Sequence, residues 1–227
     1  MNKKEIDYIK KACSITDKIL KIAIKEIKKH SFKTEKEIYN FLKERAYLNK
    51  CELAFKPIVA MHENAAEIHH KANDSRIKKG FLVLDFGVRY KGYCSDCTRT
   101  VYLGKPSKKE KELYNLVLSA QETAIMHIQP GVYAADIDLI ARAVLQDYFR
   151  NFVHGTGHGV GKKIHQAPNL KPRGRRILRN DMILTVEPGL YFKNRFGIRI
   201  EDTILIKEKA IILNKSTKKM VILDGYS

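Results

Sequence analysis

The sequence of 227 residues is poor in cysteine and has neither a long apolar run nor an apolar signal segment. Four cysteines are too few for a disulfide scaffold in a chain of this length. No apolar run approaches the roughly 20 residues that a membrane-spanning helix requires. The N-terminus leads into a charged amphipathic pattern rather than the apolar core of a secretion signal. We therefore expect a cytoplasmic protein that does not contact a membrane.

A second cysteine pair is also missing. Cys94-Ser95-Asp96-Cys97 has CxxC spacing, but a structural zinc site needs another pair, and Cys13 and Cys51 lie far apart in the sequence. We interpret Cys94 and Cys97 as reduced strand thiols, with a zinc knuckle or a redox role as the less favoured alternative.

The chain contains no linker rich in proline, glycine and serine, and no low-complexity stretch. Hydrophobic residues make up 44% and charged residues 30%, which is the balance of a soluble globular protein. The length suits one sizeable domain. We expect a single domain over residues 1–227.

Acidic residues are outnumbered by basic ones, and the formal net charge is +18. The lysines are spread through lysine- and isoleucine-rich helices. The densest basic cluster, residues 171–176 with Arg179 beyond it, has no interleaved aromatics for stacking on bases. The charge is therefore interpreted mainly as solvated surface, with a weak nucleic-acid contact as the alternative.

Apolar periodicity predicts the elements. Isoleucines recur at near-helical spacing over residues 5–29, and Thr34 with Glu37 is typical of a capping box. Pro57 interrupts an apolar run and indicates an edge strand. The predicted helices cover 5–29, 110–128 and 134–149, with another from Thr34 past Ala46; the predicted strands cover 53–60, 81–86, 93–103, 182–192, 196–207, 210–213 and 219–223. This order predicts an α+β fold of two similar halves sharing one sheet.

Asp85 and Asp96 each interrupt an apolar strand. A buried carboxylate is costly unless it is paired or bound to a cation. A hairpin folded at Lys91-Gly92 would bring the two side by side, where their repulsion demands a shared proton or a metal. One buried aspartate is usually a structural acceptor, but two on one hairpin favour a metal site.

Glu187 and Glu201 interrupt two further apolar strands. In the second strand the alternation places Arg199 and Glu201 on one face, where the arginine could orient the carboxylate. A surface ion pair is the alternative, weakened because Glu187 stands isolated shortly upstream.

Three histidines, His154, His158 and His165, lie in or near a glycine-rich stretch over residues 154–161. The stretch is neither GxGxxG nor a P-loop, so phosphate binding is not favoured. A lone histidine is usually structural, but three among glycines downstream of two buried aspartates indicate a site.

One imidazole and four carboxylates form an oxygen-rich ligand set: Asp85, Asp96, His158, Glu187 and Glu201. Such a set suits two divalent ions of the manganese, cobalt, iron or zinc kind better than a thiolate zinc site. Two bridged ions and a water would provide a hydroxide nucleophile at neutral pH.

The same motifs resemble the pita-bread metallopeptidases, the M24 family of Xaa-Pro aminopeptidases, prolidases and methionine aminopeptidases. The resemblance covers about residues 1–225 and rests on Asp85-Phe86-Gly87, Ser95 to Thr100, His154 to Gly161, Glu187-Pro188-Gly189-Leu190-Tyr191 and Arg199-Ile200-Glu201-Asp202. It implies a curved, mostly antiparallel sheet between two pseudo-symmetric α+β halves.

The resemblance also implies roles for the ligands. Asp85 would chelate one ion, while Asp96 and Glu201 would bridge both. His158 and Glu187 would bind the other ion, and Glu187 would also shuttle a proton from the bridging water. Manganese or cobalt is the expected metal, with iron or zinc as alternatives.

Further side chains match the family's substrate-binding positions. His69 would protonate the leaving amine or hold the substrate, and His165 would contact the scissile carbonyl oxygen. His154, Tyr191 and Arg199 match other active-site positions. The partners would be peptides with a free N-terminus, and the resemblance leaves a homodimer as an open alternative.

Glu-Pro-Gly-Leu-Tyr and Arg-Ile-Glu-Asp resemble the Xaa-Pro branch, whose members usually carry an additional N-terminal domain that this sequence lacks. The leading hypothesis is thus an Xaa-Pro aminopeptidase or dipeptidase. A methionine aminopeptidase on the same scaffold is the alternative, and a non-catalytic RNA- or protein-binding relative is a third hypothesis.

Overall fold

Two helices open the chain, and each begins at a polar cap. In the computed structural model, which describes residues 1–226, α1 covers Lys3–Lys28 and α2 covers Glu35–Leu48. Asn2 and Glu5 form a capping box at the start of α1. Thr34 caps α2, but the Glu37 carboxylate accepts a hydrogen bond from the Lys33 amide instead of closing a box. Both predicted helices are confirmed.

The first sheet buries the strand that leads to Asp85. The N-terminal strands are β1 (Glu52–Leu53), β2 (Ile58–Met61), β3 (Gly80–Asp85), β4 (Val88–Tyr90), β5 (Tyr93–Cys94) and β6 (Thr98–Leu103), with a 3-10 helix η1 (His62–Ala66) after β2. One sheet has the order β14-β6-β3-β2, in which β14 (Val221–Leu223) comes from the end of the chain and β2 follows Pro57 and forms an edge as expected. Asp85 pairs with Thr98 across the β3–β6 ladder.

Four of the predicted strands are too long. The 53–60 strand is interrupted over residues 54–57, between β1 and β2, and the other three are each broken beside an acidic residue. The 93–103 strand divides at residues 95–97 into β5 and β6. The 182–192 strand divides at Glu187 into β9 (Ile183–Val186) and β10 (Gly189–Phe192), and the 196–207 strand divides at Glu201 into β11 (Phe196–Arg199) and β12 (Asp202–Ile206). At the first break the Asp96 amide donates a hydrogen bond to the Thr203 hydroxyl oxygen, so Asp96 does not take part in the regular strand ladder.

The second half repeats the pattern of helices before strands. It contains α3 (Lys108–Met126), α4 (Ala134–Leu145), a 3-10 helix η2 (Gln146–Asn151), β7 (Gly157–Gly159), β8 (Gln166–Leu170), β13 (Ala210–Ile212) and β14 (Val221–Leu223). The prediction that helix 134–149 is continuous was wrong, because Gln146 has a φ of 48°, which ends the α-helix. The strands here have the order β13-β12-β9-β7-β8.

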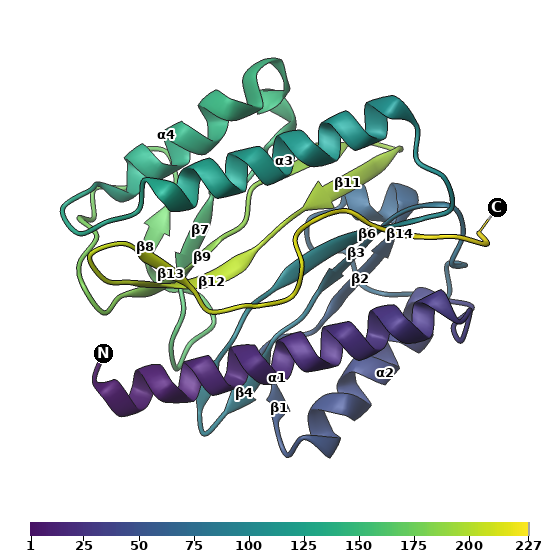
Figure 1. Ribbon diagram of the computed structural model, residues 1–227, viewed down its shortest axis with the longest axis horizontal. Coiled ribbons are helices and arrows are strands. Elements are labelled where there is room, and N and C mark those ends of the chain that lie inside the picture. The colour runs from purple at the N-terminus through teal and green to yellow at the C-terminus, as the bar shows by residue number, and fades with distance from the viewer. Residues whose placement is uncertain (227) are drawn as a thin grey trace.

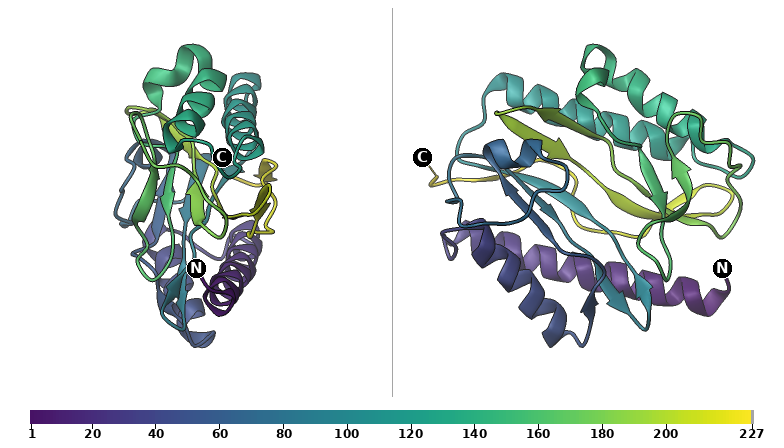
Figure 2. Two further views of the ribbon diagram at one scale, coloured as in Figure 1. Left: turned by 90° about the vertical axis from the view of Figure 1, so that its left-hand side faces the viewer. Right: turned by 180° about the vertical axis from the view of Figure 1, so that it is seen from behind.

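The strands lie between two pairs of helices, α1 with α2 and α3 with α4, and α1 and α3 lie in front of them in Figure 1. Figure 2 shows the same layers from the side and from behind. The β14–β6 pair is parallel, whereas the β3–β6, β9–β12 and β7–β9 pairs are antiparallel. The α+β prediction is confirmed. The single shared sheet is not found, because the breaks divide the strands of residues 1–226 into four sheets.

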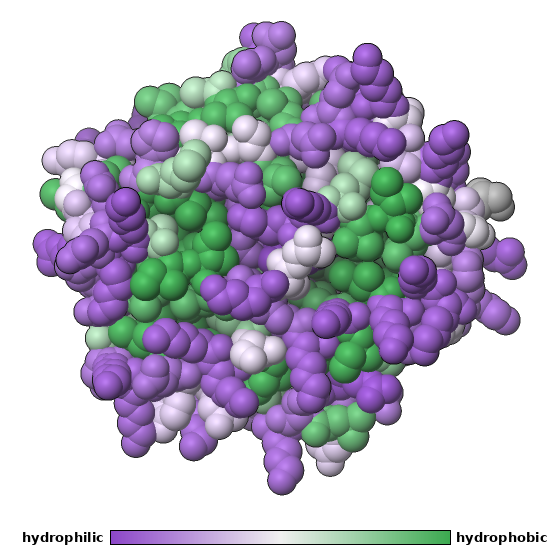
Figure 3. Space-filling view, viewed as in Figure 1, coloured by the Kyte–Doolittle hydropathy of each residue, from purple (hydrophilic) through white to green (hydrophobic). Residues whose placement is uncertain are grey.

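Polar and charged side chains cover much of the face seen in Figure 3 and separate its apolar patches. This agrees with interpreting the basic composition as solvated surface. Within residues 1–226, none of the helices is both long and apolar enough to cross a membrane.

Candidate metal centre

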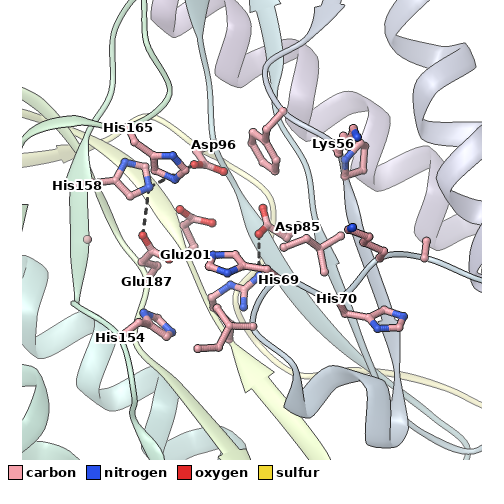
Figure 4. A pocket seen from close by; sticks show the side chains of 18 of the residues that line it. Lys56, His69, His70, Asp85, Asp96, His154, His158, His165, Glu187 and Glu201 are labelled. Atoms are coloured by element: carbon pink, nitrogen blue, oxygen red, sulfur yellow. Dashed lines mark hydrogen bonds and ion pairs between the residues drawn. The ribbon is translucent and has the colours of Figure 1, made fainter.

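A cavity of about 790 Å³ contains nearly all of the side chains singled out from the sequence. It is lined by Asp85, Asp96, His158, Glu187 and Glu201 together with His69, His154, His165 and Arg199. Tyr191 is buried behind His154 and Arg199 and bonds to both. Figure 4 shows four acidic side chains directed toward one another, those of Asp85, Asp96, Glu187 and Glu201, with His158 beside Glu187.

Asp85 ends β3 and keeps one oxygen free for a cation. Its Oδ2 accepts a hydrogen bond from Arg199 Nη2 at 2.7 Å, while its buried Oδ1 has no hydrogen-bond partner among the described residues. Arg199 does not contact Glu201 directly: its Nε donates to the Thr98 hydroxyl at 3.2 Å, and that hydroxyl donates to Glu201 Oε2, so the predicted orientation of Glu201 runs through Thr98. The strand break at residues 200–201 ends the alternation on which that prediction depended, and the guanidinium pairs with Asp85 instead.

Asp96 and Glu201 lie on the breaks between strands, where threonines fix them. The Thr203 hydroxyl donates to the Asp96 carbonyl oxygen at 2.8 Å, and the Thr98 hydroxyl donates to Glu201 Oε2 at 2.6 Å. Asp96 Oδ1 is buried without a hydrogen-bond partner in the described part of the chain. Burial first, and then neighbouring carboxylates, raise the pKa of both acids well above their usual range.

His158 presents a lone pair to two of these acids. Its Nδ1 lies 3.2 Å from the Gly159 carbonyl oxygen and must donate there, so the neutral ring carries its lone pair on Nε2. That Nε2 lies 3.3 Å from Glu187 Oε1 and 3.6 Å from Asp96 Oδ2. Burial lowers the pKa of His158, which favours the neutral ring. A lone pair facing carboxylate oxygens requires a proton or a cation between them.

These groups fit a divalent cation. Donor atoms of Asp96, His158 and Glu201 lie within 4.8 Å of one another, and the Glu187 carboxylate stands beside the same imidazole. The unpartnered oxygens of Asp85 and Asp96 extend the set of ligands toward a second position. Carboxylates with one imidazole suit hard and borderline divalent metals.

A close approach of β7 to β9 positions His158. A Cβ atom on Gly157 would lie 2.0 Å from the Thr185 carbonyl oxygen, so only glycine fits there. The Thr185 hydroxyl lies 3.0 Å from the His158 amide, from which it accepts, and 3.0 Å from Glu187 Oε1, to which it donates. One side chain thus sets the spacing of two candidate ligands.

A hydrogen-bonded chain connects His154 to Asp85. Arg199 Nη1 donates to the Tyr191 hydroxyl oxygen at 2.9 Å, and that hydroxyl lies 2.7 Å from His154 Nε2. His154 Nδ1 lies 2.8 Å from the Gly155 carbonyl oxygen, so Nδ1 donates and Nε2 accepts from the tyrosine. Burial, reinforced by the Arg199 charge, lowers the pKa of His154 to about 3. His154 is therefore a neutral positioning group near pH 7.

His165 and His69 stand beside the acidic cluster and are not part of it. The His165 ring lies 4.4 Å from that of His158, nearly perpendicular to it, and burial lowers the pKa of His165. His69 is exposed and lines the cavity (Figure 4). Both histidines can therefore reach a molecule bound in the cavity.

Sequence reasoning missed Glu35, a buried carboxylate at the start of α2. It accepts from the Met61 and Asn73 amides at 2.7 and 3.2 Å, and its Oε2 lies 2.7 Å from His70 Nε2. The segment that carries His69 is thereby tied to α2. An acid in the first turn of a helix is typical of an exposed dipole partner, so the sequence carried no signal of this burial.

Asp138 in α4 was missed as well. Its Oδ1 accepts from the Thr156 amide at 3.0 Å, and its Oδ2 accepts from Arg142 Nε at 2.8 Å. Arg142 also donates to the His154 carbonyl oxygen at 2.6 Å. Helix α4 thus holds both the start and the middle of the glycine-rich stretch. The spacing of Asp138 and Arg142, one helical turn, was the available signal, but it is equally typical of an exposed pair.

The chain belongs to metallopeptidase family M24, whose model matches residues 7–208. It is 39% identical over 224 residues to the Xaa-Pro dipeptidase of Pyrococcus furiosus, an alignment that covers 96% of this chain and 64% of that protein. The Xaa-Pro dipeptidase of Pyrococcus horikoshii is 40% identical over 225 residues, covering 97% of this chain and 64% of its own length. The chain thus spans somewhat less than two thirds of these relatives.

Solved structures confirm the pita-bread fold. The prolidase from Thermococcus sibiricus matches with a TM-score of 0.92 and 36% identity, over 98% of this chain and 62% of that chain. The X-Pro aminopeptidase from Thermotoga maritima matches with a TM-score of 0.93 and 33% identity, over 98% of this chain and 64% of that chain.

Proposed function

We propose that residues 1–227 form one catalytic domain that removes the N-terminal residue from peptides, with two divalent ions held by Asp85, Asp96, His158, Glu187 and Glu201. The observation that carries this proposal is the convergence of one imidazole lone pair and buried, unpartnered carboxylate oxygens on a single cavity. Manganese and cobalt fit this set of oxygens and one nitrogen, with iron and zinc as alternatives.

When bound, the two ions would make a water molecule nucleophilic at neutral pH and polarise the scissile carbonyl. Glu187 takes the proton of the attacking water and passes it to the leaving amine. Burial raises the pKa of Glu187 to about 7 in the metal-free cavity, and bound ions would displace that proton and leave a carboxylate able to act as a base. The Thr185 hydroxyl orients the Glu187 carboxylate for this transfer.

The histidines around the acidic cluster handle the substrate. His165 donates to the scissile carbonyl oxygen as negative charge develops there, and His69 holds the substrate or the leaving amine. His154, Tyr191 and Arg199 form the wall behind them. Arg199 fixes the orientation of the Asp85 carboxylate through their ion pair. Cleavage next to the N-terminus places the free amino group of the peptide beside the candidate ligands.

We assign the chain to the Xaa-Pro type. The relatives at 39% and 40% identity are named Xaa-Pro dipeptidases, and the Thermotoga maritima structure is named an X-Pro aminopeptidase. The motif Glu187-Pro188-Gly189-Leu190-Tyr191 supports the same branch.

The test is a comparison of purified protein, loaded with manganese or cobalt, on an Ala-Pro peptide and a Met-Ala peptide of equal length. The proposal expects at least about tenfold higher kcat/KM for the Ala-Pro peptide, about 1.4 kcal/mol of transition-state discrimination. A preference for the Met-Ala peptide would assign the chain to methionine removal. Tight, salt-dependent RNA binding without divalent-ion binding would favour the non-catalytic alternative.

A further inference from the structure

The mouth of the cavity is basic, whereas its centre is acidic. Lysines from four separate segments line it: Lys36 in the first turn of α2, Lys56 between β1 and β2, Lys71 after His70, and Lys171 after β8. All four are exposed. Within residues 1–226, the carboxylates of the lining are those of Asp85, Asp96, Glu187 and Glu201.

Three of these lysines lack an acidic partner of their own. Lys36 forms an exposed ion pair with Asp74 at 3.6 Å. In the described part of the chain, no carboxylate lies within 4.0 Å of Lys56, Lys71 or Lys171. Their charges are therefore available to a molecule that enters the cavity.

The charge of the centre does not cancel that of the lysines. In the proposed function the two divalent ions balance the four carboxylates, and Arg199 is paired with Asp85. The lysines then determine the field at the entrance, inside a cavity whose walls focus it. Figure 4 shows Lys56 on the side of Asp85 and His70, across the centre from His158 and Glu187.

We propose that Lys56, Lys71 and Lys171 select peptides with acidic residues on the leaving side of the scissile bond. This inference depends on the proposed function, in which the scissile bond next to the amino end of the peptide lies at the candidate metal centre. The following residues then extend past His69 and Lys71 toward the entrance. Acidic side chains meet the lysines there, while basic ones are repelled.

The test uses two peptides, Ala-Pro-Glu-Glu amide and Ala-Pro-Gln-Gln amide, whose amidated ends carry no carboxylate. The wild-type protein should cleave the first with about five- to tenfold higher kcat/KM, because exposed ion pairs are individually weak and three act together. The preference should shrink as salt rises, since salt screens exposed charges.

The variant Lys56→Gln/Lys71→Gln/Lys171→Gln should bring the ratio of the two kcat/KM values close to one. The matched control is Lys193→Gln/Lys209→Gln/Lys219→Gln, which removes three exposed lysines outside the lining and lowers the net charge equally. The control should keep the wild-type ratio. Equal loss in both variants, or no preference in the wild type, would overturn the inference.

Calorimetry separates this inference from the proposed function. If neither peptide is cleaved, the proposed function fails, and binding of both peptides to the protein in the presence of manganese decides whether the lysines select acidic peptides. Tighter binding of the glutamate peptide, lost in the Lys56/Lys71/Lys171 variant and kept in the control, supports the inference. Equal binding of both peptides overturns it.

Discussion

At the scale of single residues, Asp96 lies buried among other carboxylates with one oxygen unpartnered. In the metal-free protein this arrangement is repulsive, and the proposed ions would remove the repulsion. Asp96→Asn should therefore raise the thermal midpoint of the metal-free protein by about 3 °C, because about 1 kcal/mol shifts a chain of this size by 2–4 °C. The same change should abolish the rise that manganese produces in the wild type.

Scanning calorimetry with and without manganese checks this pair of effects. The exposed Asp74→Asn is the control, and it should leave both midpoints within about 1 °C. An Asp96→Asn protein that still gains stability from manganese would contradict the assignment of Asp96 as a ligand.

Glu187 makes a pH-dependent contribution to the stability of the metal-free protein. Burial raises its pKa in the folded protein to about 7, above the usual 4.5 of a glutamate, so the folded state binds more protons. Its contribution is complete below about pH 4.5 and is lost as pH rises through 7. Relative to Glu187→Gln, the metal-free wild type should therefore lose up to about 3 kcal/mol between pH 4.5 and 8.

Urea unfolding of both proteins in a chelator, at intervals across this pH range, gives the difference directly. A difference that stays constant with pH would show that the carboxyl titrates normally. In manganese, the stability of the wild type relative to Glu187→Gln should instead rise with pH, because the ion competes with the proton and binds better at high pH.

Many of the site residues could be predicted because an acid in an apolar strand is conspicuous. Asp85, Asp96, Glu187 and Glu201 interrupt runs that are otherwise buried, and the structure brings them to one cavity. The partner of Arg199 could not be predicted, because it pairs with Asp85 from a distant strand. Such a contact depends on tertiary packing that local alternation does not encode.

At the scale of elements, α4 positions the glycine-rich stretch through Asp138. The Asp138 side chain is buried and bonds to Thr156 and Arg142. Asp138→Asn should lower the free energy of unfolding by about 3 kcal/mol, because it leaves Arg142 without its partly buried partner. It should also weaken metal binding, since His158 lies two residues after Thr156.

Urea unfolding and metal titration of this variant test the role of the helix. Asp136→Asn, at an exposed position on the same helix, is the matched control and should change stability by less than about 1 kcal/mol. If Asp138→Asn loses stability but binds metal as the wild type does, α4 supports the fold without positioning the ligand.

The helices and most strands could be predicted from periodicity, but three strand breaks and one helix end could not. Asp96, Glu187 and Glu201 occupy breaks within apolar runs that read as continuous strands. Long-range bonds, such as that from the Asp96 amide to Thr203, replace the local ladder there. Beyond α4, Tyr148 and Phe149 continue the apolar pattern, although Gln146 has already ended the helix.

At the scale of the whole molecule, two α+β halves contribute candidate ligands to one cavity. Asp85 and Asp96 come from the first half, and His158, Glu187 and Glu201 come from the second (Figures 1 and 4). The cations should therefore hold the halves together as well as support catalysis. The basic surface could be predicted from the composition. That lysines from separate segments would line one cavity could not be predicted, because only the folded chain brings them together.

The central claim is that five side chains from both halves bind a pair of divalent cations. Anomalous diffraction from a crystal grown with manganese tests it most directly. We expect two anomalous peaks, one near Asp85 and one near His158 and Glu187, with Asp96 and Glu201 contacting both. A single peak, or peaks only outside this cavity, would contradict the dinuclear centre.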